Sequence, residues 1–267
     1  MKIGIIGCAG RMGRTLLKEV ISTDGCTLSG GVDHEKSNYL GKDIGSLIHE
    51  DTLGICVTDD KDALIFESDA IIDFTTPASS LACAEIASKH GTTHIIGTTG
   101  LSGEEQNKLA EYAKHTPIVF APNMSIGVNL LLSLVEQVAS TLDEEYDIEV
   151  LEMHHRNKVD SPSGTALALG RAAADGRNIA LADVSCRSRD GHTGVRPSGE
   201  IGFATMRGGD VIGDHTVMFA GSGERIEITH KASDRSIYSR GAVRAAIWAK
   251  QQNPGRLYSM KDVLNLK

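Results

Sequence analysis

Several absences narrow the class of protein before any motif is considered. The 267-residue chain has five cysteines, an odd number without any C-x-x-C pair. This usage is typical of reduced thiols in a cytosolic protein and speaks against a disulfide framework or a zinc site, so we expect no metal. No apolar run approaches the length of a membrane span, and glycine follows the first apolar residues before a signal-peptide core could form. We therefore expect a cytoplasmic protein that does not bind membranes.

Positive charge is scarce as well. The chain has 27 Lys and Arg residues against 35 Asp and Glu residues, which gives a net charge of −8. A nucleic-acid binder would normally have a basic face, so we expect no nucleic-acid partner. An anionic ligand must be attracted by local cations, because the overall field repels it. The length allows one large domain or two modest ones.

The chain opens with a predicted strand, a glycine-rich loop and a helix. The apolar run Lys2–Ile6 leads into Gly7-Cys-Ala-Gly-Arg-Met-Gly13, and a helical pattern follows from residue 15 to 21. This order is the dinucleotide-binding fingerprint, here as G-x-x-G-x-x-G, in which glycines let the backbone approach a pyrophosphate. A second strand ends in Asp33, where a carboxylate would bind the adenosine ribose. The alternative is a glycine-rich turn without a ligand.

Strand-like and helical patterns alternate as far as a long apolar helix at residues 127–138. Strand-like runs begin at Ala70, Thr93 and Pro117, and a helical pattern follows each of them. Such alternation predicts a parallel sheet with helices on both faces, in which ligands bind at the carboxyl ends of the strands. The candidate segments at these ends are Gly7–Gly13, Asp33, Gly97–Thr99 and Ala121–Met124.

A polar segment rich in chemistry lies between a predicted strand at residues 146–153 and a small-residue helix at 166–174. Pro162 fits the first turn of that helix, with Ser161 as its N-cap. The backbone N–H groups of Ser163, Gly164 and Thr165 would then be unpaired donors, which form an anion site.

Two histidines and a lysine in the same segment could supply a proton. His154 and His155 would point to opposite sides of an extended chain, so we expect different roles for them. His155 and Lys158 would add donors and positive charge to the anion site. A histidine and a lysine beside such a site suggest proton donation to a small anionic substrate. The alternative is a polar loop that only connects a strand to a helix.

The pattern changes after about residue 199. Alternating runs at residues 200–206, 211–219 and 224–230 are separated by Gly-Gly and Gly-Ser-Gly, which predicts an antiparallel meander. This places a second, sheet-based domain from about residue 125 to 234. The exposed edges of such a sheet invite pairing, so we expect a homotetramer with contacts from residues 199–230. A final helix is predicted at Ile237–Lys250, and periodicity does not tell which domain it joins.

On these motifs the chain resembles the dihydrodipicolinate reductases, also called 4-hydroxy-tetrahydrodipicolinate reductases. The resemblance covers nearly the whole chain, and its most specific part is E-x-H-H-x-x-K-x-D-x-P-S-G-T at Glu152–Thr165. Further matches are residues 7–14, Asp73-Phe-Thr75, Gly97-Thr-Thr-Gly100 and Asn123–Asn129. Members of this family reduce a cyclic diacid of the lysine pathway with hydride from NADH or NADPH.

The resemblance implies roles for individual residues. His154 would be the catalytic acid/base and Lys158 the proton donor. The site for the substrate carboxylate would comprise His155, Ser163, Gly164 and Thr165. The implied cofactor contacts are Gly7, Cys8, Ala9, Gly10, Arg11, Met12, Asp33, Gly97, Thr98, Thr99, Ala121, Pro122, Asn123 and Met124.

The expected fold class is α/β, with two domains. Residues 1–125 and 235–267 would form a Rossmann-type, doubly wound parallel sheet that binds the dinucleotide. Residues 126–234 would form an inserted α+β domain with a mostly antiparallel sheet, which binds the substrate and builds the tetramer. The resemblance further implies hinges near residues 125 and 235.

The expected cofactor is NADH or NADPH. Family members that bind the 2′-phosphate of NADPH often have arginine after the ribose-binding acid, whereas His34 follows Asp33 here. The Asp33 carboxylate would repel a 2′-phosphate, although Arg11, Arg14 or Lys36 could compensate. We therefore expect both cofactors to work, with NADH at least as efficient.

Three other functions fit the sequence less well. A semialdehyde dehydrogenase needs an activated cysteine thiolate, but Cys83 lies in a predicted helix and Cys186 in a polar stretch. A non-catalytic nicotinamide sensor would need a DNA- or partner-binding element. A serine hydrolase would need a G-x-S-x-G elbow, which the sequence lacks.

Overall fold

The chain forms two compact units. A computed structural model describes residues 1–266 and groups Met1–Ile126 with Arg235–Asn265 as the first unit, and Gly127–Asp234 as the second. These bounds lie within one residue of the expected domain boundaries, while the roles expected of the two domains stay predictions. Among the described residues, no helix combines the length and the apolar character that crossing a membrane requires.

A parallel sheet of six strands lies at the centre of the first unit. Its order is β11-β5-β4-β3-β1-β2, and every neighbouring pair is parallel. The order reverses at β1, which has β2 on one side and β3 on the other, and ligands bind at such switch points. The strands are β1 (Lys2–Ile6), β2 (Thr27–Val32), β3 (Ala70–Asp73), β4 (Thr93–Ile96), β5 (Ile118–Phe120) and β11 (Leu257–Tyr258).

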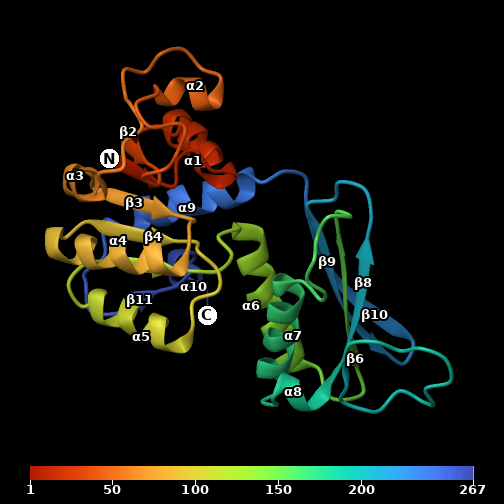
Figure 1. Ribbon diagram of the computed structural model, residues 1–267. Coiled ribbons are helices and arrows are strands. Elements are labelled where there is room, and N and C mark those ends of the chain that lie inside the picture. Colours follow the sequence, from red (N-terminus) through yellow and green to blue (C-terminus); the bar gives the residue numbers. More distant parts are fainter. Residues whose placement is uncertain (267) are drawn as a thin grey trace. The chain divides into compact units, whose positions relative to one another are not determined.

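Helices cover both faces of this sheet (Figure 1). One face carries α1 (Arg11–Ser22) and α9 (Ser236–Ala249), and the other carries α3 (Lys61–Glu67), α4 (Pro77–His90) and α5 (Gly103–Tyr112). The short helices α2 (Ile44–Ile48) and α10 (Met260–Val263) complete the unit. The last long helix, which periodicity left open and the family resemblance assigned to the first domain, packs in the first unit.

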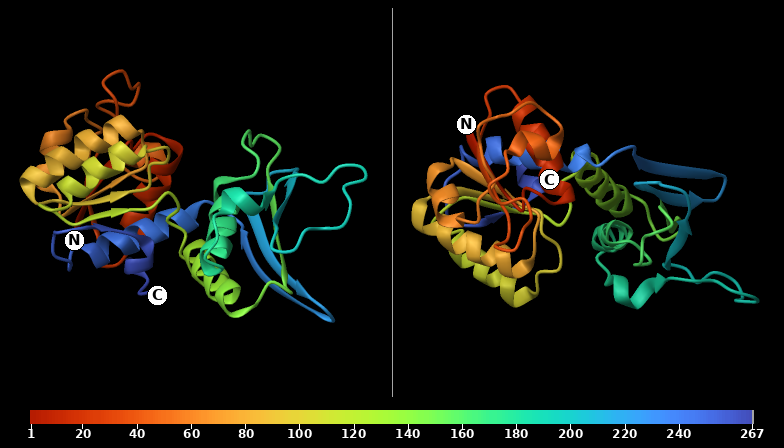
Figure 2. Two further views of the ribbon diagram at one scale, coloured as in Figure 1. Left: turned by 90° about the horizontal axis from the view of Figure 1, so that it is seen from below. Right: turned by 45° about the horizontal axis from the view of Figure 1, so that its top comes forward.

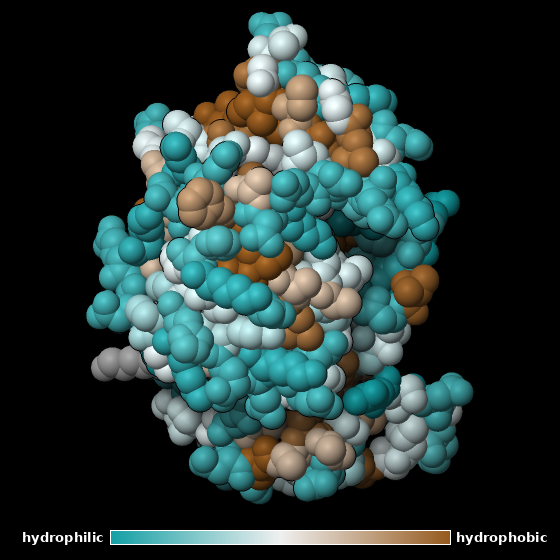
Figure 3. Space-filling model, turned by 60° about the vertical axis from the view of Figure 1, so that its left-hand side comes forward, coloured by the Kyte–Doolittle hydropathy of each residue, from teal (hydrophilic) through white to brown (hydrophobic). Residues whose placement is uncertain are grey.

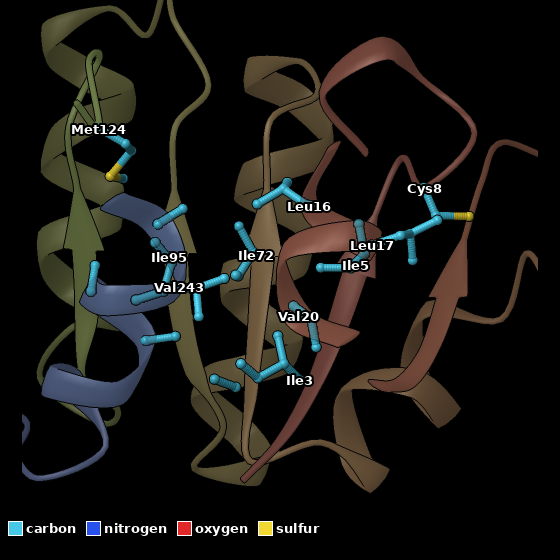
Figure 4. Packing of buried hydrophobic residues seen from close by; sticks show 14 of the residues in the cluster. Ile3, Ile5, Cys8, Leu16, Leu17, Val20, Ile72, Ile95, Met124 and Val243 are labelled. Atoms are coloured by element: carbon cyan, nitrogen blue, oxygen red, sulfur yellow. The ribbon is translucent and has the colours of Figure 1, made fainter. Parts of the chain in front are cut away.

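The largest core lies between the sheet and the helices α1 and α9. In Figure 4, Leu16 and Leu17 of α1 and Val243 of α9 point toward strand residues such as Ile5 and Ile72. Each of these side chains is at most 2% exposed. Full burial of one such side chain contributes about 1.5–3 kcal/mol to stability relative to exposure. This layer therefore holds α1 and α9 on the sheet.

The second unit has a five-stranded sheet with helices on one face (Figures 1 and 2). Its order is β10-β9-β6-β8-β7. Every second residue of β6 is buried, because α7 packs against that face. The strands are β6 (Asp147–His154), β7 (Ser185–Cys186), β8 (Ile201–Arg207), β9 (Gly213–Gly221) and β10 (Glu224–Ala232), and the helices are α6 (Ile126–Thr141), α7 (Gly164–Gly176) and α8 (Leu181–Val184).

The predicted meander is only partly correct. Strands β9 and β10 form the expected antiparallel hairpin, but β6 lies between β8 and β9 and pairs parallel with β8. The Gly208-Gly209 segment therefore crosses the end of β6, where the Gly208 N–H donates to the carbonyl of His154 at 2.9 Å. Alternation identifies strands but not their neighbours, and insertion of β6 satisfies its backbone groups on both sides. The expected fold class is confirmed, with a mixed second sheet that is antiparallel across β10-β9-β6.

Hydrophilic residues cover most of the molecular face shown in Figure 3. Hydrophobic residues appear between them in several small groups. Phe66, at 70% exposed, is one of the large hydrophobic residues at the surface of the first unit.

Candidate active site

The glycine-rich loop brings the backbone of β1 close to helix α1. Gly7 has φ +70°, and a Cβ on Gly13 would lie 2.2 Å from the carbonyl oxygen of Gly7, so neither position accepts another residue without rearrangement. Gly10 is the N-cap of α1 and has no side chain to accept from the first turn. The N–H groups of Arg11 and Met12 therefore lie at a helix N-terminus without a side-chain cap. This geometry fits the pyrophosphate of a dinucleotide.

The other expected cofactor segments lie at the same edge of the sheet, because all six strands are parallel. Asp33 follows β2, and its carboxylate accepts from the His34 N–H at 2.9 Å and from the Ser37 hydroxyl at 2.7 Å. These two bonds fix the carboxylate where a ribose would bind. The segments 97–99 and 121–124 follow β4 and β5. The residues present thus fit a nicotinamide dinucleotide.

Two of the expected cofactor contacts have side chains in the core. Cys8 and Met124 are both 0% exposed (Figure 4). The Cys8 N–H donates to the carbonyl of Val32 at 3.0 Å, and burial raises the pKa of the Cys8 thiol to about 12. A Cβ on Gly241 of α9 would lie 1.7 Å from the Met124 carbonyl oxygen. These two side chains therefore serve the packing of the unit.

A stack of one aromatic ring and two cations lies beside this edge. The Arg14 guanidinium and the Lys42 ammonium each lie 5.0 Å from the centroid of the Tyr39 ring. The Tyr39 N–H donates to the Ser37 hydroxyl, which in turn donates to Asp33. The sequence reasoning named Arg14 but missed Tyr39 and Lys42, since no motif connects residues so far apart in the chain.

In the second unit, a buried acid and a buried histidine occupy the end of β6. His154 is 8% exposed, and its Nδ1 lies 2.5 Å from a carboxylate oxygen of Glu152, which is fully buried. The two residues are two positions apart in the strand and share one face. Gly213 of β9 leaves room for the imidazole, because a Cβ there would lie 2.9 Å from His154 Nε2.

Glu152 connects the histidine to two other segments. Its two oxygens accept from both terminal nitrogens of Arg207 at 2.9 Å, and one also accepts from the Ser163 N–H at 3.0 Å. Burial raises the pKa of Glu152, but hydrogen bonds from Arg207, His154 and Ser163 outweigh it and hold the pKa below its usual range. The sequence reasoning gave this acid no role, although its position on the face of His154 was a usable signal.

The helix after the polar segment begins later than expected. Helix α7 starts at Gly164 with Ser163 as its N-cap, whose hydroxyl accepts from the Ala166 N–H at 3.1 Å. The expected cap at Ser161 is therefore wrong, and Pro162 precedes the helix. The Ser163 N–H is also not an unpaired donor, since Glu152 accepts from it. Gly164 and Thr165 occupy the first two helical positions, where the helix itself supplies no acceptor.

His154 and Lys158 lie in different electrostatic surroundings. Burial lowers the pKa of His154, and Lys158 and Arg207 lower it further against the effect of Glu152. Burial therefore favours the neutral form of the imidazole. The Lys158 ammonium lies 2.8 Å from an oxygen of Asp160. His155 lies outside the strand and is half-buried.

His215 is a further buried histidine in this cluster. Its ring lies 5.0 Å from that of His154 in an edge-on arrangement, and its Nε2 lies 3.2 Å from the Ser163 hydroxyl. Burial lowers the pKa of His215 to about 4, so the ring is neutral. The sequence reasoning missed His215 because strand β9 is distant in sequence.

Both halves of this chain match a known protein family. Residues 1–124 match the family described as "Dihydrodipicolinate reductase, N-terminus", and residues 127–264 match "Dihydrodipicolinate reductase, C-terminus". The chain belongs to the dihydrodipicolinate reductase family. The family resemblance inferred from the motifs is thereby confirmed.

Curated relatives and a solved structure agree with this family. The chain is 52% identical over its full length to "4-hydroxy-tetrahydrodipicolinate reductase 1" of Mesorhizobium japonicum, of which it covers 97%. It is also 52% identical over its full length to the 4-hydroxy-tetrahydrodipicolinate reductase of Brucella abortus, of which it covers 99%. The fold is similar to that of a dipicolinate-bound dihydrodipicolinate reductase from a Paenisporosarcina species. That match has a TM-score of 0.77 and 22% identity, and it covers 97% of each chain.

Proposed function

We propose that this dihydrodipicolinate reductase family member reduces 4-hydroxy-tetrahydrodipicolinate (dihydrodipicolinate) to tetrahydrodipicolinate, with NADH or NADPH, in the diaminopimelate route to lysine. The observation that carries the proposal is the Glu152–His154 pair beside Lys158 and the start of α7, within a chain of this family. The full-length identity to curated relatives of this name supports it. Dipicolinate in the related solved structure supports a small dicarboxylate as the ligand.

The first unit would hold the cofactor. The first-turn N–H groups of α1 would bind the pyrophosphate, and the Asp33 carboxylate would accept from the adenosine ribose hydroxyls. When bound, the nicotinamide supplies the hydride. Thr98 and Asn123 are among the expected cofactor contacts and follow β4 and β5.

The second unit would hold the substrate and supply the proton. Loss of the 4-hydroxyl group as water converts 4-hydroxy-tetrahydrodipicolinate to dihydrodipicolinate, which has a conjugated C=C–C=N system. Hydride addition to that system leaves negative charge, which a proton from the Lys158 ammonium would neutralise. The same charge, together with His155 and the first turn of α7 at Gly164 and Thr165, would bind the carboxylates, while Ser163 caps that turn. Lys158 then regains its proton from solvent.

His154 would assist as a neutral acid/base. If its Nδ1–H donates to Glu152, its Nε2 is an acceptor that can hold a proton donor or a water in place. The Glu152 carboxylate would fix this tautomer, because an ionised carboxylate only accepts hydrogen bonds.

We also propose that the protein is a cytoplasmic homotetramer with contacts from residues 199–230. Strand β10 is at the edge of the second sheet, and none of its residues is buried, with all of Glu224–Glu227 exposed. An exposed edge favours pairing with another chain.

The direct test is an assay of the proposed reaction. Pyruvate and aspartate semialdehyde are condensed to the cyclic substrate, and the absorbance of NADH or NADPH is followed after the purified protein is added. We expect cofactor oxidation that depends on the substrate. A folded protein that oxidises neither cofactor under these conditions would refute the proposed function.

A further inference from the structure

A buried acid–histidine pair lies within the sheet of the first unit, outside the expected site residues. Asp73 ends β3 and His94 lies in β4, and both are 0% exposed. His94 is in register with Ile71, so Asp73 and His94 are diagonal neighbours on one face of the sheet. The His94 Nε2 lies 3.7 Å from Asp73 Oδ2.

The pair is poorly explained as packing alone. Within residues 1–266, the two ring nitrogens of His94 have no partner within hydrogen-bond distance, and the same holds for Asp73 Oδ2. Buried polar atoms without partners are destabilising, and they are rare in cores. Apolar residues of similar volume would stabilise this layer more, as Ile72 and Ile95 do on the opposite face of the same strands.

The other oxygen of Asp73 organises the loop that follows β3. Its Oδ1 accepts from the Thr75 N–H at 2.9 Å and from the Thr75 hydroxyl at 2.6 Å. The Thr98 hydroxyl lies 3.5 Å from the same oxygen and itself accepts from the Thr75 N–H and from Ser80. Burial raises the pKa of Asp73, but His94, Thr75 and Ser80 lower it by more, so the acid is an ionised acceptor.

Through Thr75 and Phe74, this network connects three loops at the carboxyl ends of the strands, where the cofactor is proposed to bind. The Thr75 methyl lies 2.6 Å from the position of a Cβ on Gly7, so Thr75 contacts the glycine-rich loop. The Phe74 ring lies 2.2 Å from the position of a Cβ on Gly97, so it packs on the turn after β4. The loops after β1, β3 and β4 therefore depend on one carboxylate for their mutual arrangement.

We propose that Asp73 is a positioning residue for cofactor binding, which fixes these three loops through its Oδ1, while His94 Nε2 lies 3.7 Å from its Oδ2 and favours the ionised carboxylate. The inference rests on the proposed function. Asp73 acts through Thr75 and Thr98, and it does not itself contact the cofactor. His94 orients and stabilises the carboxylate from the neighbouring strand.

The test compares Asp73→Asn with Asp69→Asn. Asp69 precedes β3 at the opposite edge of the sheet, where it contacts the Lys250 ammonium and accepts from the Lys2 N–H. The Kd for NADH is measured by titration without substrate, and KM values for NADH and for the dicarboxylate are measured by assay. We expect Asp73→Asn to raise the Kd and KM for NADH about 10-fold, typical of losing an outer partner of a site.

Further measurements separate positioning from a general loss of structure. The KM for the dicarboxylate at saturating NADH should stay within about twofold in Asp73→Asn, because the expected substrate site is in the second unit. Asp69→Asn should leave all three constants unchanged. His94→Gln should raise the Kd for NADH by a smaller factor than Asp73→Asn. If Asp73→Asn does not fold, Thr75→Val removes only one donor and should still raise that Kd.

The outcomes decide between the alternatives. A folded Asp73→Asn variant that binds NADH like the wild type would overturn the inference. So would an equal rise in the KM for the dicarboxylate, or an unchanged Kd in Thr75→Val. A wild-type protein that binds neither NADH nor NADPH would refute the proposed function itself, and this inference with it.

Discussion

Replacement of Glu152 by glutamine would test the buried network at the end of β6. The substitution keeps the shape of the side chain but removes its charge and one of its acceptor oxygens. Three partners are affected: the Nδ1 of His154, the guanidinium of Arg207 and the N–H of Ser163. Fold stability and activity should therefore both change.

The loss of stability follows from the charge left on Arg207. Removing one partner of a fully buried ion pair costs about 3–5 kcal/mol, because the other charge is left uncompensated. The Arg207 side chain is 21% exposed and also donates to the carbonyl of Asp160 at 2.7 Å. Water and this second acceptor reduce the penalty, so we expect about 2 kcal/mol in the free energy of unfolding.

The loss of activity follows from the orientation of His154. A carboxylate can only accept from Nδ1, whereas a glutamine amide can also donate to it and select the other tautomer. Turnover should fall about 10²-fold, at the upper end of the range for an outer-shell partner. The KM for NADH should not change, since no cofactor contact is expected at this residue.

The stability difference should also depend on pH. The folded-state pKa of Glu152 is lowered, so its contribution is complete above the unfolded value of about 4.3 and is lost as the pH falls through the folded value. Urea unfolding at pH 7 should therefore separate wild type from Glu152→Gln by more than unfolding below about pH 4.

A matched control is available in the same strand. Glu149 contacts Arg189 and Arg196 but not His154, so Glu149→Gln loses similar ion pairs outside the site. Its turnover should remain within about twofold of wild type. Wild-type turnover and stability in Glu152→Gln would refute the reasoning about this network.

Four further predictions concern the proton donor, the cofactor, acid stability and assembly. His154→Gln and Lys158→Ala should each lower kcat about 10²-fold, whereas Thr165→Val should chiefly raise KM; full activity of the first two variants would remove their assigned roles. The kcat/KM for NADH should equal or exceed that for NADPH. His34→Arg should shift the cofactor preference toward NADPH. A strong NADPH preference of the wild type would show that Arg11 and Arg14 outweigh Asp33. Because burial lowers the pKa of His215 to about 4, the unfolded chain binds a proton between about pH 6.5 and 4 that the folded chain does not. The free energy of unfolding should therefore fall by up to about 3 kcal/mol as the pH falls through this range. His215→Gln should flatten this pH dependence, and an unchanged slope would contradict the prediction. Light scattering should give a tetramer at working concentration, and a monomer would contradict the assembly proposed from the edge strand β10.

The sequence by itself determined the elements of the fold and the positions of the two candidate sites. Strand β1 has the predicted bounds Lys2–Ile6, and the predicted helices at residues 127–138 and 166–174 lie within α6 and α7. Periodicity, caps and glycines act over a few residues, so such features can be read locally. The loops at strand ends share one edge because a parallel sheet requires it.

Only the tertiary structure decided which strands are neighbours and which side chains meet. Strand β6 separates β8 from β9, although alternation alone predicted a meander through both. Glu152 meets Arg207 across 55 residues, and Asp73 faces His94 from the adjacent strand. These pairings depend on the register of strands distant in the chain, which no local pattern encodes.

The charge of each candidate group was also decided by the fold. The sequence offers a histidine and a lysine as groups that could supply a proton, but burial lowers the pKa of His154, while the Lys158 side chain remains partly exposed. The anion site likewise loses the Ser163 N–H, because Glu152 reaches it only in the folded chain. Desolvation and long-range hydrogen bonds set these properties, and both exist only once the strands have packed.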